Sequence, residues 1–255
     1  MVERFIYDGT FEGYLTAIFE IYERRPAIAK IEREQFASEN LFDETFKVWT
    51  DMTKADRVWK GILTKIGKPA SRLIYRAFLS EKLEMERLLQ AIIRKGFNGR
   101  NVVDDFSDLD VLKLNQIVKE VGREKHRMDA FVRFRKTRDN IYFATVEPDF
   151  NVLPLNASHF KNRYADQKWL IYDLNRNYGI YYDLHKLETV DLEISRDINS
   201  SLKAPMYFTE EEMLYQDLWK NYFKSTNITS RKNMRLHLRH VPKRYWKYLS
   251  EKSPL

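Results

Sequence analysis

The sequence predicts an α+β fold in which a mainly helical first half precedes an antiparallel sheet. In the first half, apolar residues recur at intervals of three and four, as at Phe11, Leu15 and Ile18, which is typical of a buried helix face. In the second half, short apolar runs alternate with turn residues, as at Asn175 and Asn177. The 255 residues are 44% hydrophobic and 14% aromatic, which excludes a disordered chain and predicts a packed core.

The first half is expected to begin with a strand and to continue mainly as helices. Thr10 is the expected N-cap of the first helix, because its hydroxyl can accept a hydrogen bond from a first-turn N–H. Gly67 and Pro69 separate two later helices, since glycine favours a helix end and proline a first turn. The expected elements are a strand at 5–7, a helix at 11–25, an extended segment at 45–49 and helices at 54–66, 70–95 and 108–128.

The second half is expected to form two hairpins with an intervening helix, and helices packed on one face of the sheet. Thr209 with Glu212 three residues later is typical of a capping box at the start of a further helix. The expected elements are strands at 130–135 and 141–146, a helix at 151–164, strands at 168–173, 178–184 and 187–193, and a helix from 209 to 223. The predicted division is a mainly helical region, 1–129, and an antiparallel α+β region with a basic tail, 130–255, unless both form one integrated domain.

Several classes of site are excluded by residue type. The chain has no cysteine, so disulfides, thiolate metal sites and thiolate-held iron–sulfur clusters are excluded. His237 and His240 do not have the spacing of a zinc motif, and we expect no metal and no cofactor. No secretory signal and no apolar run of about 18 residues is visible, which predicts a cytoplasmic protein without a membrane partner.

Positive charge is concentrated in two stretches. The formal net charge is +7, and residues 224–255 contain nine Lys or Arg against the single acid Glu251. Residues 122–140 contain seven Lys or Arg against three acids. A concentrated basic patch attracts a polyanion, so both stretches predict contact with nucleic acid.

The C-terminal stretch 235–246 carries the strongest signal for nucleic-acid binding. Arg235, His237 and Arg239 alternate, so in an extended segment they would project on one side and could contact phosphates. Tyr245 and Trp246 could stack on an unpaired base. The alternative is a solvated basic face ending in a helix whose Trp246 packs on the core. The predicted nucleic-acid-binding residues are Arg127, Arg133, Arg135, Arg235, His237, Arg239, Lys243, Arg244, Tyr245 and Trp246.

A catalytic site is only weakly indicated. The candidate acid–base residues are Glu124, His126, His237 and Asp173. Glu124 and His126 are two residues apart and do not share a helix face, which weakens a dyad built from them. The basic residues around them are also explained by the dipole at a helix C-terminus.

Four motifs, taken in order along the chain, resemble one family. They are Tyr7-Asp8-Gly9-Thr10-Phe11-Glu12-Gly13, then Glu124-x-His126-Arg127-Met128 followed by Phe131-Val132-Arg133-Phe134, then Trp169-x-Ile171-Tyr172-Asp173-x-x-Arg176-x-x-Gly179-x-Tyr181-Tyr182-Asp183, and finally Arg239-His240-Val241-Pro242-Lys243-Arg244-Tyr245-Trp246. The chain resembles the DNA-metabolism (DNA-repair) family of unknown biochemical activity. At Val241 the family pattern has Met, a conservative difference.

The resemblance implies a DNA context and a partner rather than a reaction. Family members are usually encoded beside a DNA-modification or repair radical SAM protein, and some are fused to a uracil-DNA-glycosylase-like domain, which we do not expect in this chain. We therefore expect a DNA-binding accessory protein acting with a radical SAM partner. The alternatives are an enzyme that processes DNA directly, of lyase, nuclease or glycosylase type, and a purely structural partner of the radical SAM protein.

Overall fold

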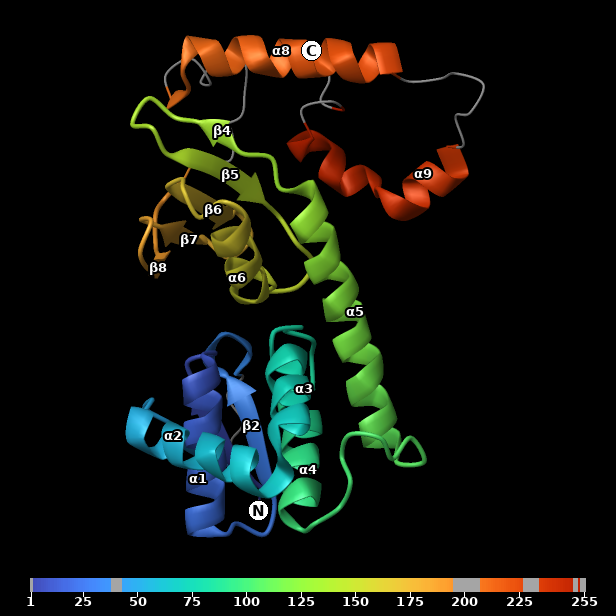
Figure 1. Ribbon diagram of the computed structural model, residues 1–255. Helices are drawn as coiled ribbons and strands as arrows, with labels where there is room; N and C mark the ends of the chain where they lie inside the picture. Colours follow the sequence, from blue (N-terminus) through green and yellow to red (C-terminus); the bar gives the residue numbers. More distant parts are fainter. Residues whose placement is uncertain (1, 38–42, 195–206, 227–233, 250–251, 253–255) are drawn as a thin grey trace. The chain divides into compact units, whose positions relative to one another are not determined.

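The computed structural model of the chain describes residues 2–37, 43–194, 207–226, 234–249 and 252. The chain divides into two compact units, Met1–Gly122 and Arg123–Leu255. Helix α5, Leu109–Phe131, begins in the first unit and ends in the second (Figure 1). The division predicted from the sequence, at 129/130, falls near the end of this helix. Helix and strand content confirm the predicted α+β class.

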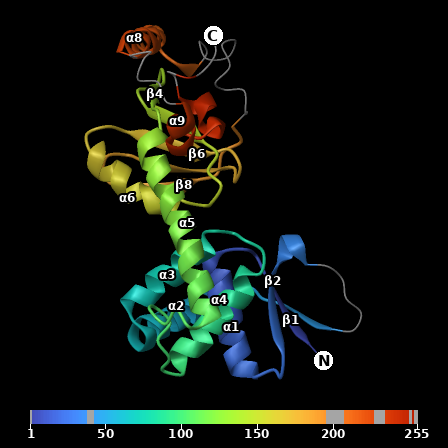
Figure 2. The same cartoon turned by 90° about the vertical axis from the view of Figure 1, so that its right-hand side faces the viewer.

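The first unit contains a small parallel sheet and a group of helices. The strands lie in the order β2-β1-β3, and both neighbours of β1 run parallel to it. Helices α1 to α4 lie on one side of this sheet (Figure 2). The elements are β1 (Glu3–Tyr7), α1 (Phe11–Arg24), β2 (Ala29–Arg33), the short 3-10 helix η1 (Glu34–Phe36), β3 (Glu44–Lys47), α2 (Met52–Gly61), the π-helical turn η2 (Ile62–Ile66), α3 (Lys68–Phe78) and α4 (Met85–Phe97).

The predicted helix start at Thr10 is confirmed. The Thr10 hydroxyl accepts a hydrogen bond from the Gly13 N–H at 2.9 Å, and Asp8 in turn accepts from the Thr10 N–H at 2.9 Å. Gly67, with a φ of 100°, ends the π-helical turn, and Pro69 lies in the first turn of α3. These local signals were therefore sufficient to place the ends of three helices.

Two elements of the first unit differ from the sequence prediction. Strand β2 was not predicted, because its sequence Ala-Lys-Ile-Glu-Arg is largely charged; only Ile31 and Arg33 are buried. The expected helix at 70–95 is in fact two helices, because Glu81 and Glu84 both adopt a positive φ, 53° and 62°, between them. The break was not predicted because no glycine or proline marks it.

The second unit contains a mixed sheet in the order β4-β5-β6-β7-β8. The two predicted hairpins are present, and they are joined side by side through β5 and β6, which are parallel because α6 crosses between them. The elements are β4 (Arg135–Lys136), β5 (Tyr142–Val146), α6 (Leu153–Arg163), β6 (Trp169–Asp173), β7 (Tyr178–Tyr182), β8 (Leu187–Val190), α8 (Glu210–Thr226), α9 (Met234–His240) and the 3-10 helix η4 (Lys243–Tyr248).

The first predicted strand of this unit is much shorter than expected. Residues up to Phe131 belong to α5, and β4 contains only Arg135 and Lys136. The predicted strand at 130–135 is therefore wrong for all of its residues except Arg135. The helix continues because Met128 lies in the core and keeps the α5 pattern of buried residues.

The sheet of the second unit is covered on both faces. On one face, Phe160 of α6 packs edge-on against Trp169, with ring centroids 6.1 Å apart. On the other face Phe143 and Tyr172 form a buried cluster with Phe208, which precedes α8. Thr209 caps the start of α8 as predicted, because its hydroxyl accepts a hydrogen bond from the Glu212 N–H at 3.2 Å. The Glu212 side chain accepts a hydrogen bond from the Lys136 N–H and so links α8 to β4.

Candidate nucleic-acid interface

Glu124, on the last part of α5, is the centre of a buried polar cluster. Its side chain is only 1% exposed. The carboxylate accepts hydrogen bonds from the Tyr245 hydroxyl, from Arg244 Nη2 at 2.9 Å, from Arg127 Nη1 at 3.3 Å and from the Asp149 N–H at 3.1 Å. Two guanidinium groups and two further donors satisfy both oxygens, so the buried charge is paired and hydrogen-bonded. The carboxylate is thus arranged as an acceptor that joins segments of the chain.

Tyr245 and Arg244 attach η4 to α5 through this cluster. The Tyr245 ring is buried and packs on Phe131, with centroids 5.3 Å apart. Burial raises the pKa of the Tyr245 hydroxyl, so it stays protonated and donates. Arg244 lies over the Tyr245 ring at 4.6 Å and also pairs with Asp149 at 2.6 Å. Because its ring is in the core, Tyr245 offers no face for the base stacking that we expected of it.

Asp173, at the end of β6, is fully buried and pairs with Arg176. Arg176 Nη1 lies 2.8 Å from Asp173 Oδ2 and also donates to the Pro148 carbonyl at 3.1 Å. Burial raises the pKa of Asp173, and the nearby Arg176 opposes this shift. Glu124 and Asp173 therefore hold the same loop, 148–149, the first through the Asp149 N–H and the second through Arg176. Both candidate catalytic carboxylates are engaged in structural contacts.

The candidate histidines are not brought to these carboxylates. His126 is exposed whereas Glu124 is buried, as expected for residues two apart on a helix. His237 belongs to α9, but its side chain lies outside the described residues. Neither the cavity between Met128 and Trp169 nor the cleft beside Trp49 is lined by Glu124, His126 or Asp173. The described residues also contain no group of three or more His, Asp or Glu side chains suited to a metal ion.

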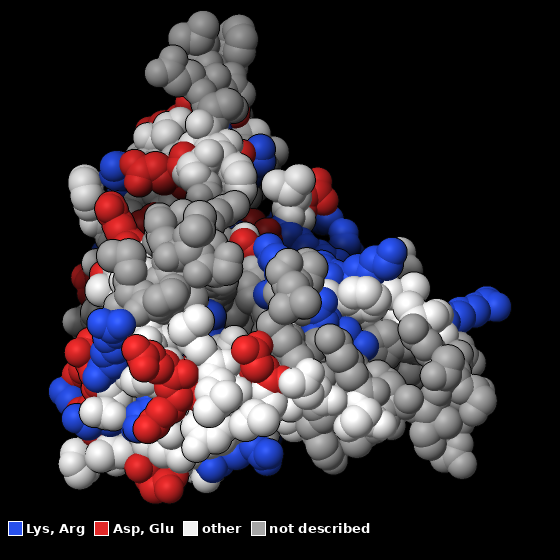
Figure 3. Space-filling view, turned by 90° about the horizontal axis from the view of Figure 1, so that it is seen from above, with Lys and Arg blue, Asp and Glu red and all other residues white. Residues whose placement is uncertain are grey.

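The residues at 235–240 are helical and not extended as expected. Within α9, Arg235 and Arg239 are four residues apart and so still share a face, whereas a residue midway between them does not. Both side chains are exposed, as is Lys243 at the start of η4. Among the residues that the structure describes, none of these three cations has an ion-pair partner. Figure 3, viewed from the side of α8 and α9, shows Lys and Arg gathered right of centre. We call Arg235, Arg239 and Lys243 the basic face.

The other predicted phosphate ligands have partners within the protein. Arg127 and Arg244 are bound to Glu124, and Arg133 donates to the Ala130 carbonyl at 2.8 Å. Arg135 lies over the buried Phe208 ring at 3.8 Å, and burial lowers the pKa of its guanidinium to about 10. These arginines position the unit's own elements.

Trp246 is half-buried. Its indole Nε1 donates to the Val241 carbonyl at 3.0 Å, and Lys252 lies over its ring at 5.7 Å. From its sequence context, this residue could either stack on a base or pack on the protein. Its hydrogen bond and partial burial agree with packing.

Asp149 is a member of the Glu124 cluster that was not predicted from the sequence. Asp149 contributes its N–H to Glu124 and its carboxylate to Arg244, but no short motif contains it. The Glu124–Tyr245 contact joins residues 121 positions apart, which no local pattern can predict. Arg176 lies in the turn after β6, three residues from Asp173, and pairs with it. It belongs to the third sequence motif, but that motif did not indicate the pairing.

The comparison with protein families matches residues 83–251, more than half of the chain, to a domain of unknown function, DUF4130. The chain belongs to the DUF4130 family. The matched region of the DUF4130 domain runs from just before α4 to the end of η4 and contains Glu124, Asp173, Arg244 and Tyr245. This agrees with the resemblance to a family without an assigned activity. No curated protein matches the chain.

None of the helices that the structure describes combines the length and the apolar character that crossing a bilayer requires.

Proposed function

We propose that this protein is a cytoplasmic DNA-binding accessory protein in DNA repair or modification that acts with a radical SAM partner. The observation that carries the proposal is the basic face. Arg235, Arg239 and Lys243 are exposed cations without ion-pair partners among the described residues. The two arginines lie in α9, and Lys243 is the first residue of η4, which Tyr245 attaches to Glu124. Guanidinium groups four residues apart on one helix face suit successive phosphate oxygens.

The attachment of η4 matters because a phosphate contact is more favourable when the segment that carries the cation is already ordered. Lys243 lies directly before Arg244 and Tyr245, which are held on α5 by the buried carboxylate of Glu124. The backbone of this end of the basic face is therefore ordered before any ligand binds, which reduces the entropic cost of binding.

The proposal is tested by binding of the purified protein to labelled single- and double-stranded DNA across a salt series. Each phosphate that a cation neutralises adds about 0.7–0.9 to the slope of log affinity against log salt. We expect binding at low salt with a slope of about 2–3, corresponding to the cations of the basic face. Absence of binding at low ionic strength would overturn the proposal.

A purely structural role beside a partner protein is the second candidate, because one helix exposes a run of large apolar side chains. Leu214, Tyr215 and Leu218 of α8 are 61%, 63% and 54% exposed. Exposed apolar patches on a folded protein mark interaction surfaces. Co-purification with a radical SAM protein that is lost on Leu214→Asp with Leu218→Asp, without any DNA binding, would favour this candidate.

Direct enzymatic processing of DNA receives less support. The buried carboxylates of Glu124 and Asp173 are already bound to arginines, so neither is placed to exchange a proton with a bound substrate. Cleavage or base release from DNA by the purified protein, abolished by His126→Ala, would restore this alternative.

A further inference from the structure

The first unit contains a cleft of about 470 Å³ on the helical side of the sheet. It is bounded by Phe46 and Trp49 of β3 and the segment after it, by Glu20 and Arg24 of α1, and by Lys54 of α2. The volume lies in the range of roughly 300–1,000 Å³ that is usual for small-molecule sites. The cleft belongs to neither the Glu124 cluster nor the basic face.

Trp49 is the most unusual residue of the cleft, because its side chain is 75% exposed. Tryptophan is on average highly buried, since its large apolar surface stabilises a core. Trp49 instead lies at the rim of a hollow, with the Lys47 ammonium 4.8 Å from its ring centroid. An exposed indole beside a cleft is suited to stacking on a planar ring of a ligand.

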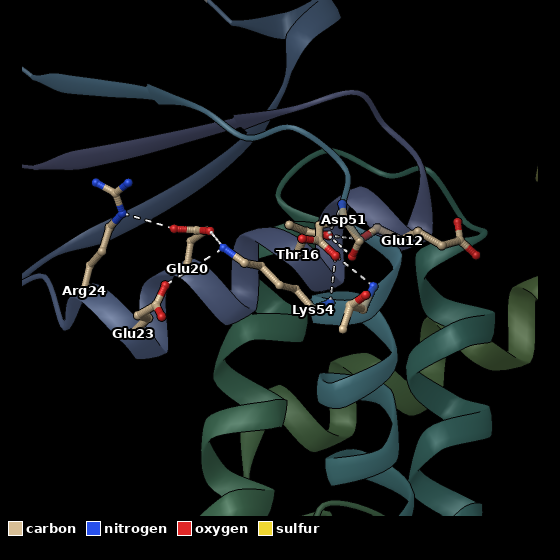
Figure 4. Close-up of polar contacts among 8 residues, drawn as sticks. Glu12, Thr16, Glu20, Glu23, Arg24, Asp51 and Lys54 are labelled. Atoms are coloured by element: carbon tan, nitrogen blue, oxygen red, sulfur yellow. Dashed lines mark hydrogen bonds and ion pairs between the residues drawn. The ribbon is translucent and has the colours of Figure 1, made fainter.

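Arg24 and Lys54 supply cationic donors to the same cleft. Arg24 Nε donates to Glu20 at 3.2 Å, and its guanidinium lies over the Phe46 ring at 4.3 Å. Figure 4 shows the two terminal nitrogens of Arg24 pointing away from Glu20. Among the described residues these nitrogens have no acceptor. The guanidinium group of Arg24 is thus held by the hydrogen bond from its Nε and by its contact with the Phe46 ring, while its two terminal nitrogens remain as donors for a ligand.

Glu20 holds both cations in place. Its carboxylate accepts from Lys54 Nζ at 2.5 Å as well as from Arg24 (Figure 4). The hydrogen bond from Lys54, reinforced by that from Arg24, holds the pKa of Glu20 below its ordinary value. The second carboxylate of the cleft, Asp51, accepts from the Thr53 and Lys54 N–H groups as the N-cap of α2. Glu20 is therefore paired with two cations, and Asp51 is hydrogen-bonded by backbone donors.

We propose that this cleft binds a nucleotide, with the base stacked on Trp49 and the phosphate at Arg24 and Lys54. A nucleotide combines the two features that the cleft recognises, a planar aromatic ring and an anion with several acceptor oxygens. The lining carries three cations, Arg24, Lys47 and Lys54, against two carboxylates, and Lys47 also pairs with Glu34 at 2.6 Å. The two terminal nitrogens of Arg24 therefore contribute most to the preference for an anionic ligand. The ligand is either a free mononucleotide or one residue of an unpaired DNA strand. The proposal does not depend on the basic face.

The test is isothermal titration calorimetry of the full chain, which does not depend on Trp49 as a reporter, with four probes: deoxynucleoside 5′-monophosphates, the matching nucleosides, inorganic phosphate and a short single-stranded oligodeoxynucleotide. We expect saturable binding of the monophosphates, with affinity reduced about tenfold or more by Trp49→Ala and much less by Trp49→Phe. Trp219→Phe, which changes an exposed tryptophan of the second unit, is the matched control and should leave the affinity unchanged.

Two further comparisons identify the source of the ligand and separate this site from the basic face. Arg24→Gln should weaken the monophosphate but not the nucleoside, because only the phosphate contacts the guanidinium. Tighter binding of the oligonucleotide than of the monophosphate identifies an unpaired strand, and the reverse identifies a free nucleotide. Arg235→Ala with Arg239→Ala should leave the monophosphate affinity unchanged. The proposal is overturned if no probe binds saturably, or if Trp49→Ala binds as well as the unaltered chain while both retain the same melting temperature.

Discussion

The Tyr245 hydroxyl donates a hydrogen bond to the Glu124 carboxylate, and this contact joins η4 to α5 across 121 residues of sequence. Both side chains are 1% exposed, so the contact is made out of water. Arg244 reaches the same carboxylate from the neighbouring position of η4. The exposed cations of the basic face therefore adjoin a segment that is attached to the core of the second unit by a buried, charge-assisted hydrogen bond.

Loss of the Glu124 carboxylate should destabilise the second unit strongly. In Glu124→Ala, the Tyr245 hydroxyl and two guanidinium groups lose their acceptor, and we expect the free energy of unfolding to fall by about 3–5 kcal/mol. Tyr245→Phe removes one donor and should cost about 1–2 kcal/mol. Urea denaturation measures both values, and the double variant gives the coupling energy. Strictly additive effects would show that the two side chains do not interact.

Gly13 should be unable to accept a side chain although it lies within a helix. A Cβ atom there would lie 2.2 Å from Asp8 Oδ1 and 2.8 Å from Thr50 Oγ1. We therefore expect Gly13→Ala to lower the free energy of unfolding by about 1–3 kcal/mol. Gly122→Ala in α5 is the control, since a Cβ there meets no atom within 4 Å, and it should stabilise the chain by about 0.5–1 kcal/mol. Equal effects in thermal melts would contradict the close approach at Gly13.

The contribution of Glu20 to stability should depend on pH. Its pKa is lowered in the folded protein by the hydrogen bond from Lys54, so its contribution is present above the ordinary pKa of 4.5 and is lost as the pH falls through the folded value. The difference in melting temperature between the unaltered chain and Glu20→Gln should therefore be largest near pH 7 and shrink below about pH 4. A difference that grows on acidification would show that the assigned ion pairs do not stabilise the fold.

The sequence predicted elements whose signals are local. The Thr10 cap and the turn at Asn177, with a φ of 55°, depend on residues within one turn of the chain. Strand β2 was missed because a parallel edge strand can retain charged residues, including Arg33, whose guanidinium pairs with Glu86 at 2.6 Å. Apolar composition alone does not predict β2, because its pairing with β1 outweighs the low strand propensity of its charged residues.

The sequence predicted which residues belong to the candidate site better than it predicted what those residues do. Arg235, Arg239 and Lys243 are exposed as a phosphate-binding surface requires, although α9 replaces the expected extended segment. Tyr245 was a candidate for stacking on a base, which requires an exposed ring. Its burial follows from the pairing with Glu124, which depends on a contact that sequence spacing does not encode.

The most direct test of the basic face compares two charge-matched double variants in DNA binding. Arg235→Ala with Arg239→Ala removes two exposed arginines four residues apart on α9, and Arg72→Ala with Arg76→Ala removes two exposed arginines at the same spacing on α3. We predict that the first pair weakens binding to all DNA sequences and lowers the salt slope by about 1.4–1.8, while the second pair changes neither quantity. Unchanged affinity and salt slope in the first pair, or an equal loss in both pairs, would contradict the proposal that the basic face binds DNA.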